Sequence, residues 1–421
     1  MKGKGRQIYL DHAATTPTDP AVVRAMAPYW TEYFGNPSSL YRLGQTSKKA
    51  INQSRQIVAN NLSGQPDEIF FTAGGTESIN LAIKGLLSAV KIAEKTNHFI
   101  TSAIEHHAVL HTAESIKKQN QEVSILPVDD QGIVMMPALK DAIRDNTVLV
   151  SIMMANNEIG TIQPIREIGA YLQKLNTERL ARKLPRIFFH TDACQGAGAL
   201  DLNVHKLHVD LLSLNGSKIY GPKGVGVLYV RRGTPLTPLI DGGGQENNLR
   251  SGTENVPDIV GLGKALELIN KNKVKENARL IKLRDWLIKE ILSKIPKTRL
   301  NGHPSTRLPN NVNVSILDVE GEAMLLYLDE VGIQASTGSA CTSTTLEPSH
   351  VIRALGCPYE VAHGSMRFTL GKSTAKKDLE YLMSKLPGIV KRLRQASPVK
   401  IDPDEVNRAI KNAPRKIINL S

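Results

Sequence analysis

A lysine in the middle of the chain has the setting that covalent carbonyl chemistry needs. Lys218 follows an apolar run at residues 209–214 and lies in the turn Gly216-Ser217-Lys218. A lysine placed there is partly removed from water, which favours the neutral amine that forms a Schiff base with an aldehyde. An isolated turn lysine is more often an ordinary surface residue, so this interpretation depends on what lies beside it.

Asp192 supplies a suitable neighbour. It ends the apolar run one strand earlier than Lys218, so both side chains should lie at the same edge of a sheet. A carboxylate beside a pyridine nitrogen keeps that ring protonated and makes it an electron sink, as pyridoxal 5′-phosphate (PLP) requires. A lone aspartate at a strand end is more often a helix cap. The pair, in this order, is more specific and favours PLP chemistry.

Two further motifs fit a phosphorylated aromatic cofactor. Gly74-Gly75-Thr76 lies between a predicted strand and a predicted helix, where free backbone N–H groups and the Thr76 hydroxyl can bind a phosphate. The alternative is an ordinary helix cap at Thr76. His106 follows the predicted strand 98–102 and could stack on a ring and transfer protons. Its alternative is a loop histidine with local partners.

Nucleotide enzymes are disfavoured. The phosphate-loop pattern G-x-x-x-x-G-K-[ST] is absent, and no G-x-G-x-x-G follows a predicted strand.

The chain has three cysteines, and each has a different setting. Cys341 lies in a stretch rich in glycine, serine and threonine at residues 335–345, where a thiol is accessible and can act as a nucleophile. Cys194, next to the strand end, fits a packing role, and Cys357 has no obvious partner. An odd count without C-x-x-C argues against a disulfide framework and against a structural zinc site, so we expect no metal.

Short apolar runs that alternate with helical patterns must position these residues. They predict a mostly parallel sheet with helices on both faces, an α/β fold in which ligands bind at the carboxyl ends of the strands. The predicted strands lie at 68–72, 98–102, 147–153, 186–190, 209–214 and 225–230.

The pattern changes after about residue 260. Long amphipathic helices at 274–294 and 376–395 flank short strands at 311–315 and 366–370, which is typical of a smaller α+β domain. The sequence therefore predicts four parts, which are an N-terminal segment packing with the small domain (1–20), a large α/β domain (21–260), a small domain carrying Cys341 (261–400) and a peripheral tail (401–421).

Composition indicates a soluble protein of 421 residues with 41% hydrophobic and 22% charged residues. The net charge of +13 comes from dispersed lysines and arginines, and aromatic residues make up only 5%. This favours a solvated basic face, and we expect no direct nucleic-acid binding. No apolar run is long enough for a membrane span and the first ten residues lack the core of a secretory signal, so we expect a cytoplasmic location.

The chain resembles the cysteine desulfurases of the NifS/IscS type, which are fold-type I PLP enzymes of the class V aminotransferase group. The resemblance runs from residue 9 to about residue 397. It is carried by blocks that occur in the family's order, namely Tyr9-Leu10-Asp11-His12-Ala13-Ala14-Thr15-Thr16-Pro17, Gly35-Asn36-Pro37-Ser38-Ser39, Thr76-Glu77-Ser78, Asn156-Asn157-Glu158-Ile159-Gly160, Lys218-Ile219-Tyr220-Gly221-Pro222-Lys223-Gly224, Arg250-Ser251-Gly252-Thr253, Gly338-Ser339-Ala340-Cys341-Thr342-Ser343 and Leu346-Glu347-Pro348-Ser349.

The resemblance implies a PLP-dependent enzyme that removes sulfur from L-cysteine and releases L-alanine. Lys218 would hold the cofactor and remove the α-proton, and His106 would stack on the ring and act as acid and base. Cys341 would take the sulfur as a persulfide and pass it to an acceptor protein in iron–sulfur cluster assembly or in tRNA or DNA sulfur modification.

The resemblance also implies the binding residues. Asn36 and Arg367 would hold the substrate carboxylate, a task that suits the guanidinium fork. Thr253 would reach the cofactor phosphate from the partner subunit of a homodimer. The full set of cofactor-binding residues is Lys218, Asp192, Gln195, Asn157, Gly75, Thr76, Asn215, Ser217 and Thr253.

The sequence departs from the family pattern at several positions. Ser217 stands where the family usually has histidine, Asn215 where it often has serine, and Tyr41 where many members have histidine. The tail after residue 397 does not resemble the segment with which well-known members bind a scaffold protein. These departures concern cofactor affinity and partner identity more than the chemistry.

Two other functions remain open at this point. The first is a PLP lyase or aminotransferase of the same fold, such as a selenocysteine lyase, although such reactions do not need the thiol of Cys341. The second is a degenerate, non-catalytic relative that binds a partner, for which Ser217 is the only hint.

Overall fold

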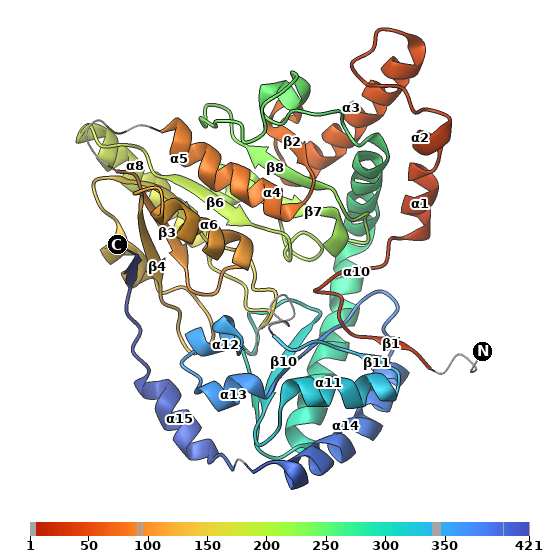
Figure 1. The fold of residues 1–421 in the computed structure, drawn as a ribbon, viewed down its shortest axis with the longest axis vertical. Helices are drawn as coiled ribbons and strands as arrows, with labels where there is room; N and C mark the ends of the chain where they lie inside the picture. The colour runs from red at the N-terminus through yellow and green to blue at the C-terminus, as the bar shows by residue number, and fades with distance from the viewer. Residues whose placement is uncertain (1–5, 91, 93–95, 339–346, 399, 421) are drawn as a thin grey trace.

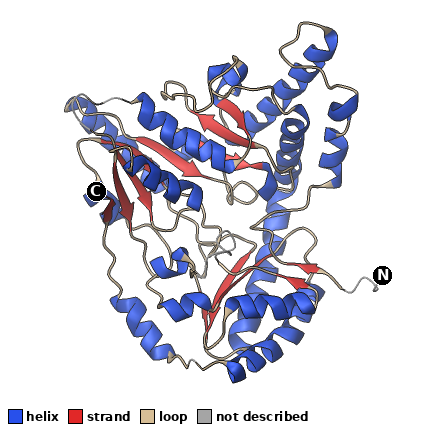
Figure 2. Cartoon of the chain, in the orientation of Figure 1, coloured by secondary structure: helices blue, strands red, loops and turns tan. Residues whose placement is uncertain are grey.

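The computed structural model describes residues 6–90, 92, 96–338, 347–398 and 400–420. Figure 1 shows a larger part around a long sheet and a smaller part below it, with one helix running through both. Figure 2 shows helices on the outside of both parts and strands inside them.

Within the described residues, the strands form one large sheet and two small ones. Their bounds are β1 Ile8–Tyr9, β2 Ile69–Thr72, β3 His98–Ser102, β4 Glu122–Leu126, β5 Thr147–Ser151, β6 Phe188–Asp192, β7 Leu211–Asn215, β8 Gly226–Val230, β9 Thr298–Leu300, β10 Asn311–Ile316, β11 Ile333–Gln334, β12 Ser365–Thr369 and β13 Ile418–Leu420.

The helices differ widely in length. Their bounds are α1 Pro20–Met26, α2 Pro28–Thr31, α3 Arg42–Leu62, α4 Gly75–Asn80, α5 Leu86–Ala89, α6 His107–Lys117, α7 Met136–Ala142, α8 Ile165–Ala181, α9 Val204–Leu207, α10 Val256–Lys294, α11 Gly321–Glu330, α12 His350–Ala354, α13 Tyr359–His363, α14 Lys376–Ala396 and α15 Pro403–Asn412.

The large sheet has the strand order β13-β4-β3-β5-β6-β7-β8-β2. Strands β4, β3, β5, β6 and β7 are parallel to their neighbours in this run, whereas β8, β2 and β13 pair antiparallel. Each of the six strands predicted for the first part of the chain is present within a few residues of its predicted place. The predicted α/β fold class is confirmed.

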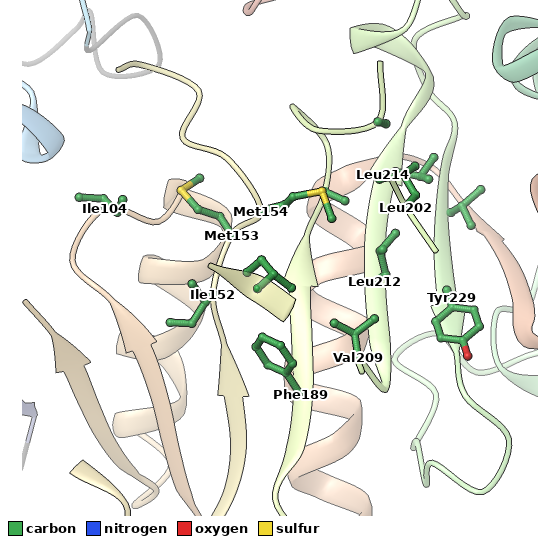
Figure 3. Close-up of a cluster of buried hydrophobic side chains, with 14 of the residues drawn as sticks. Ile104, Ile152, Met153, Met154, Phe189, Leu202, Val209, Leu212, Leu214 and Tyr229 are labelled. Atoms are coloured by element: carbon green, nitrogen blue, oxygen red, sulfur yellow. The ribbon is translucent and has the colours of Figure 1, made fainter. Parts of the chain in front are cut away.

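Side-chain alternation along the strands gives the sheet two apolar faces. Phe188, Leu211 and Leu228 belong to the core on the side of α4 and α6. Their neighbours Phe189 and Leu212 belong to the core on the side of α3, α8 and α10. Figure 3 shows part of this second core, where Met153, Met154, Phe189, Leu212 and Tyr229 lie among buried aliphatic side chains. Because both faces are covered, the strand ends are what the sheet offers to a ligand.

The smaller part has its own apolar core. Its sheet has the order β12-β10-β9, and β1 pairs in parallel with β11. This core includes Ile8 and Leu10 from the N-terminal segment. The strands predicted at 311–315 and 366–370 correspond to β10 and β12, and the helix predicted at 376–395 corresponds to α14.

Helix α10 joins the two parts and begins eighteen residues before the predicted start at 274. Its residues up to Ile269 pack in the core of the large part, and those from Leu280 pack in the core of the small part. The predicted boundary at 260/261 therefore falls inside one continuous helix, and the division of the chain into domains stays a prediction.

The C-terminal residues return to the large part. Val406 and Ile410 of α15 are buried in the apolar cluster that also contains Leu355 and Cys357, and the chain then reaches the large sheet. Strand β13 pairs antiparallel with β4, and Asn419 Oδ1 accepts hydrogen bonds from Ser124 Oγ (2.6 Å) and from Arg144 Nη2 (2.7 Å). In Figure 1 this segment runs along the left side from α15 to the end of the chain beside β4. The tail that the sequence predicts to be peripheral thus supplies the edge strand of the sheet.

Across the described ranges of the chain, no helix combines the length and the apolar character that crossing a bilayer requires.

Candidate active site

A cavity of about 260 Å³ lies where the sheet meets the smaller part. Its walls come from the carboxyl ends of β3, β5, β6 and β7, from the start of α4 and from β12 of the smaller part. Of the residues predicted for the site, the cavity brings together Gly75, Thr76, His106, Asn157, Asp192, Gln195, Asn215, Lys218 and Arg367.

Lys218 ends a short 3₁₀ turn directly after β7. Its Nζ donates a hydrogen bond to the carbonyl oxygen of Ala14, which also lines the cavity. The carbonyl of Ser217 accepts hydrogen bonds from Thr16 N (2.8 Å) and Thr16 Oγ1 (2.9 Å). The N-terminal segment therefore holds the turn in place and positions the lysine amine at the cavity.

Asp192 is the last residue of β6, which pairs in parallel with β7, and it lies opposite Ser213 in the register of these two strands. The side chain is buried, and its Oδ1 accepts a hydrogen bond from Cys194 N at 2.9 Å. This hydrogen bond restricts rotation of the carboxylate, so its charge stays directed at the cavity. A partner for a cationic ring nitrogen needs such a fixed position.

His106 is both a helix cap and a cavity residue. Its Nδ1 accepts a hydrogen bond from Ala108 N at 3.1 Å and so caps α6, while the ring lines the cavity. Burial lowers the pKa of His106, against the opposing effect of the Asp192 carboxylate. The ring is therefore neutral at neutral pH and can accept a proton. His106 thus has the local partner of the alternative interpretation and also lines the cavity, and its role in proton transfer stays a prediction.

The start of α4 forms the end of the cavity that suits an anion. Gly75 has no room for a side chain, because an added Cβ would lie 2.8 Å from Cys194 Sγ. Burial raises the pKa of the Cys194 thiol, which agrees with the packing role expected for it. Asn215 Oδ1 is buried, and no hydrogen-bond partner for it occurs among the described residues.

Arg367 reaches the cavity from β12. Its Nη2 forms an ion pair with Asp11 Oδ1 at 2.7 Å, and its Nη1 donates to the Asn157 carbonyl at 3.1 Å. Its Nε is buried and has no hydrogen-bond partner in the part of the chain that the structure describes. The guanidinium is thus held at the cavity edge with donor capacity left over for a carboxylate.

Four predicted residues are not placed in the cavity. Asn36 is exposed, and its Oδ1 accepts a hydrogen bond from Ser38 N at 2.9 Å. Thr253 is also exposed. Ser217 is half-buried and does not line the cavity, although Lys218 of the same turn does. Cys341 lies outside the described residues.

Several ionisable side chains at the site were not among the predicted residues. Burial raises the pKa of Glu105 to about 8 and that of Glu158 to about 7, and burial beside other histidines lowers the pKa of His107 to about 4. His107, Glu158 and His350 line the cavity. Glu105 and Glu158 each adjoin a predicted site residue in the sequence, which was the one available signal.

Comparisons with known proteins identify the family of the chain. The family model described as aminotransferase class-V matches residues 8–382. The cysteine desulfurase IscS of Methanosarcina thermophila is 53% identical over 396 residues, which cover 94% of this chain and 95% of the relative. A solved NifS-like protein matches with a TM-score of 0.84 and 34% identity over 92% of this chain and all of its own.

A second solved structure, described as SspA in complex with cysteine, matches with a TM-score of 0.75 and 37% identity over 86% of this chain and 99% of its own. These similarities extend over nearly the whole chain, and the resemblance seen in the sequence is confirmed. The chain belongs to the class V aminotransferase family and, within it, to the cysteine desulfurases of the NifS/IscS type.

Proposed function

We propose that this protein is a PLP-dependent enzyme that converts L-cysteine to L-alanine and holds the released sulfur on Cys341 as a persulfide. The observation that carries the proposal is the convergence of Lys218, Asp192, His106 and Arg367 on one cavity. The solved relative that holds cysteine supports this substrate, and the relatives named as cysteine desulfurases support the reaction.

The residues present fit PLP. Lys218 offers an amine to the aldehyde, Asp192 a carboxylate to the ring nitrogen, and Gly75 and Thr76 the start of a helix to the phosphate. The Asn215 amide lines the same cavity, and its Nδ2 group is a donor of the kind that a phosphate accepts. When bound, PLP supplies an electron sink for the charge that develops at the α-carbon of the substrate.

The chain's own residues perform the remaining steps. Arg367 binds the substrate carboxylate through the donor capacity that Asp11 and Asn157 leave unused. The Lys218 amine accepts the α-proton, and the neutral His106 ring is placed to exchange a proton with the substrate.

The Cys341 thiolate then attacks the substrate sulfur. A sulfur–sulfur bond forms as the carbon–sulfur bond breaks, and protonation of the remaining fragment gives alanine. One thiol and one cysteine thus become one persulfide and one alanine, with no external oxidant. A protein sulfur acceptor, in the iron–sulfur or nucleic-acid modification classes implied by the family, removes the sulfur.

We further propose a homodimer, in which Asn36 and Thr253 act at the partner's cavity. Both residues are exposed and lie outside the cavity of their own chain. Asn36 stands between large exposed apolar side chains, of which Phe34 is 68% and Leu40 is 93% exposed. In Figure 1 the helices on either side of this segment, α2 and α3, lie at the outer edge of the molecule. An exposed apolar segment of this kind is typical of an interface.

The test is to reduce the PLP-loaded protein with borohydride and to locate the modified peptide, followed by assay of alanine release from L-cysteine. We expect the label on Lys218 and a Cys341 persulfide detectable by peptide mass. Cys341→Ala should abolish alanine release, while Cys357→Ala should leave it unchanged. Undiminished alanine release by Cys341→Ala would instead favour a lyase, and a label elsewhere than Lys218 would exclude the assigned site.

A further inference from the structure

Glu158 lies beside the cavity in the loop after β5, and its backbone is held from several sides. Its N–H donates to Asn156 Oδ1 at 2.8 Å. Its carbonyl accepts hydrogen bonds from the side chains of Asn311 (3.0 Å) and Asn313 (3.1 Å) of β10. These buried amide groups link the large part to the sheet of the smaller part and leave the Glu158 backbone no freedom to shift.

The carboxyl group of Glu158 contacts both sides of the segment that carries Cys341. Ser349 follows Cys341 in the chain, and its Oγ donates a hydrogen bond to Glu158 Oε2. Gly338 precedes Cys341 and packs so closely against Glu158 that an added Cβ would lie 2.4 Å from Glu158 Oε2. Glu158 and Ser349 are both buried, at 4% and 2% exposure.

Ser349 transmits this contact to a helix. Its Oγ also accepts a hydrogen bond from Ile352 N at 3.2 Å, which caps α12. One hydroxyl therefore joins the start of α12 to the Glu158 carboxyl group. Breaking the bond to Glu158 would leave the cap intact but remove one of the two hydrogen bonds that join the start of α12 to the cavity wall, the other being that of His350 Nε2 with the Glu105 carbonyl at 3.0 Å.

Chain length makes the position of these contacts matter. Cys341 is three residues after Gly338 and eight before Ser349, and three residues of chain span at most about 11 Å. We propose that Glu158 is a positioning residue that holds Gly338 and Ser349 at the cavity and thereby sets how effectively the Cys341 thiol meets the substrate sulfur. The inference rests on the proposed function.

The experiment compares Glu158→Ala, Glu158→Gln and Ser349→Ala in the PLP-loaded protein, in single turnovers with L-cysteine. Two signals are followed, which are the change in cofactor absorbance on cysteine binding and the appearance of the Cys341 persulfide by peptide mass. In Glu158→Ala the absorbance change should keep its wild-type rate, while persulfide formation slows about tenfold or more, the effect expected from one lost buried hydrogen bond.

The conservative variant separates positioning from general damage. A glutamine carbonyl oxygen can still accept from Ser349 Oγ, so Glu158→Gln should form persulfide within about twofold of the wild-type rate. Ser349→Ala should be slowed like Glu158→Ala, and the double variant should be no slower than either single one. In steady state kcat should fall with KM unchanged.

A matched control uses the other buried pair of serine and carboxyl group at the site. Ser102 Oγ donates to Glu105 Oε1 at 2.5 Å, and among the described residues neither side chain of this pair contacts Gly338 or Ser349. Glu105 meets α12 through its backbone carbonyl, which bonds His350 and which Ser102→Ala leaves in place. Ser102→Ala should therefore form persulfide at the wild-type rate.

Failure of the inference and failure of the proposed function give different results. Wild type that forms no persulfide overturns the proposed function. Wild type that forms it, with Glu158→Ala and Ser349→Ala equally fast, overturns the positioning role alone. An equal slowing of the absorbance change and of persulfide formation, or no rescue by Glu158→Gln, also overturns it. If Glu158→Ala does not fold, Ser349→Ala decides alone.

Discussion

Burial changes the ordinary ionisation of the side chains around the cavity. It lowers the pKa of His106 and raises that of Glu105 to about 8, so that both groups are neutral near pH 7. The fixed charges that the proposed reaction needs then come from Asp192 and Arg367, which hydrogen bonds hold in place. The neutral side chains add no further charge to the site beside Asp192 and the ion pair of Arg367 with Asp11.

The hydrogen bonds of Arg367 predict a specific effect of replacing its guanidinium by the single ammonium group of lysine. Arg367→Lys keeps the positive charge but cannot serve Asp11, the Asn157 carbonyl and a substrate carboxylate together. We expect kcat/KM for L-cysteine to fall by about 10- to 100-fold, mainly through KM. Steady-state assay of alanine release measures this. The same substitution at the exposed ion pair of Arg6 with Asp378 is the control and should change kcat/KM less than about twofold.

Cysteine reactivity gives a second prediction at this scale. Cys194 and Cys357 are buried, and burial raises the pKa of both thiols, so little thiolate exists to react. Neither should be alkylated by iodoacetamide at pH 8 in the native protein, and both should be alkylated in guanidinium chloride. Peptide mass analysis distinguishes the sites. Alkylation of native Cys194 would mean that the reagent reaches this thiol through the cavity that it lines and that the thiol ionises there.

The sequence predicted the cavity residues that follow strands better than those that depend on another element. Asp192 and Lys218 end neighbouring strands, so strand prediction alone places them together. Glu158 escaped prediction because its importance comes from Gly338 and Ser349, which lie about 180 residues away in the chain. Contacts of that range have no local pattern.

Among the elements, the strands with continuous apolar runs were predicted, and those that depend on their neighbours were not. Strand β4 mixes glutamate and serine with apolar residues, and β13 is only three residues long. Each is specified by pairing with a partner distant in the sequence.

Helix α10 began earlier than predicted because its first half contains residues that usually interrupt helices. Pro257 lies in the first turn, where its missing N–H costs nothing. Gly261 and Gly263 let the helix approach its neighbours, because added Cβ atoms would lie 2.6 Å from Met26 Sδ and 3.0 Å from Ser54 Cβ. Tertiary packing therefore outweighs the weak local propensity.

The tail offers a test at the element scale. Deleting residues 414–421 removes β13 and the hydrogen bonds of Asn419 with Ser124 and Arg144, and it exposes the edge of β4. We expect the thermal midpoint to fall by a few degrees, with cofactor binding and turnover at 25 °C unchanged, because the tail lines no wall of the described cavity.

The control for this deletion is Lys416→Ala, which alters an exposed side chain of the same segment and should not move the midpoint. Loss of turnover at an unchanged midpoint would contradict a purely structural role of the tail.

At the scale of the whole molecule, buried histidines set the response of stability to acid. Burial lowers the pKa of His98 and of His190 to about 4. In the unfolded chain their pKa is about 6.5, so below that pH the unfolded state takes up protons that the native state does not. Stability should therefore fall as pH decreases from about 6.5 towards 4, by about 1 kcal/mol for each of these groups at pH 5.5.

Glu105 acts in the opposite direction. Its raised pKa means that the native state keeps a proton that the unfolded chain loses, so its contribution is present below about pH 4.5 and is lost as pH rises towards 8. Thermal midpoints between pH 5 and 8 measure both effects at constant cofactor loading. His190→Gln should flatten the acid side and Glu105→Gln the alkaline side. A midpoint of His190→Gln that changes between pH 6.5 and 5 by as much as the wild-type midpoint would contradict the assignment for this histidine.

Helix α10 also determines how the molecule comes apart. Its 39 residues form a rod about 58 Å long, and no residue between Ile269 and Leu280 of this fully described helix is buried. Either half of the helix loses its helical structure when the core against which it packs unfolds, because isolated helices are marginally stable in water. Unfolding of one core therefore destabilises the half of α10 that packs in the other core. Calorimetry should record one peak of heat absorption, and Leu287→Ala in the lower core should lower the melting temperature of both cores together.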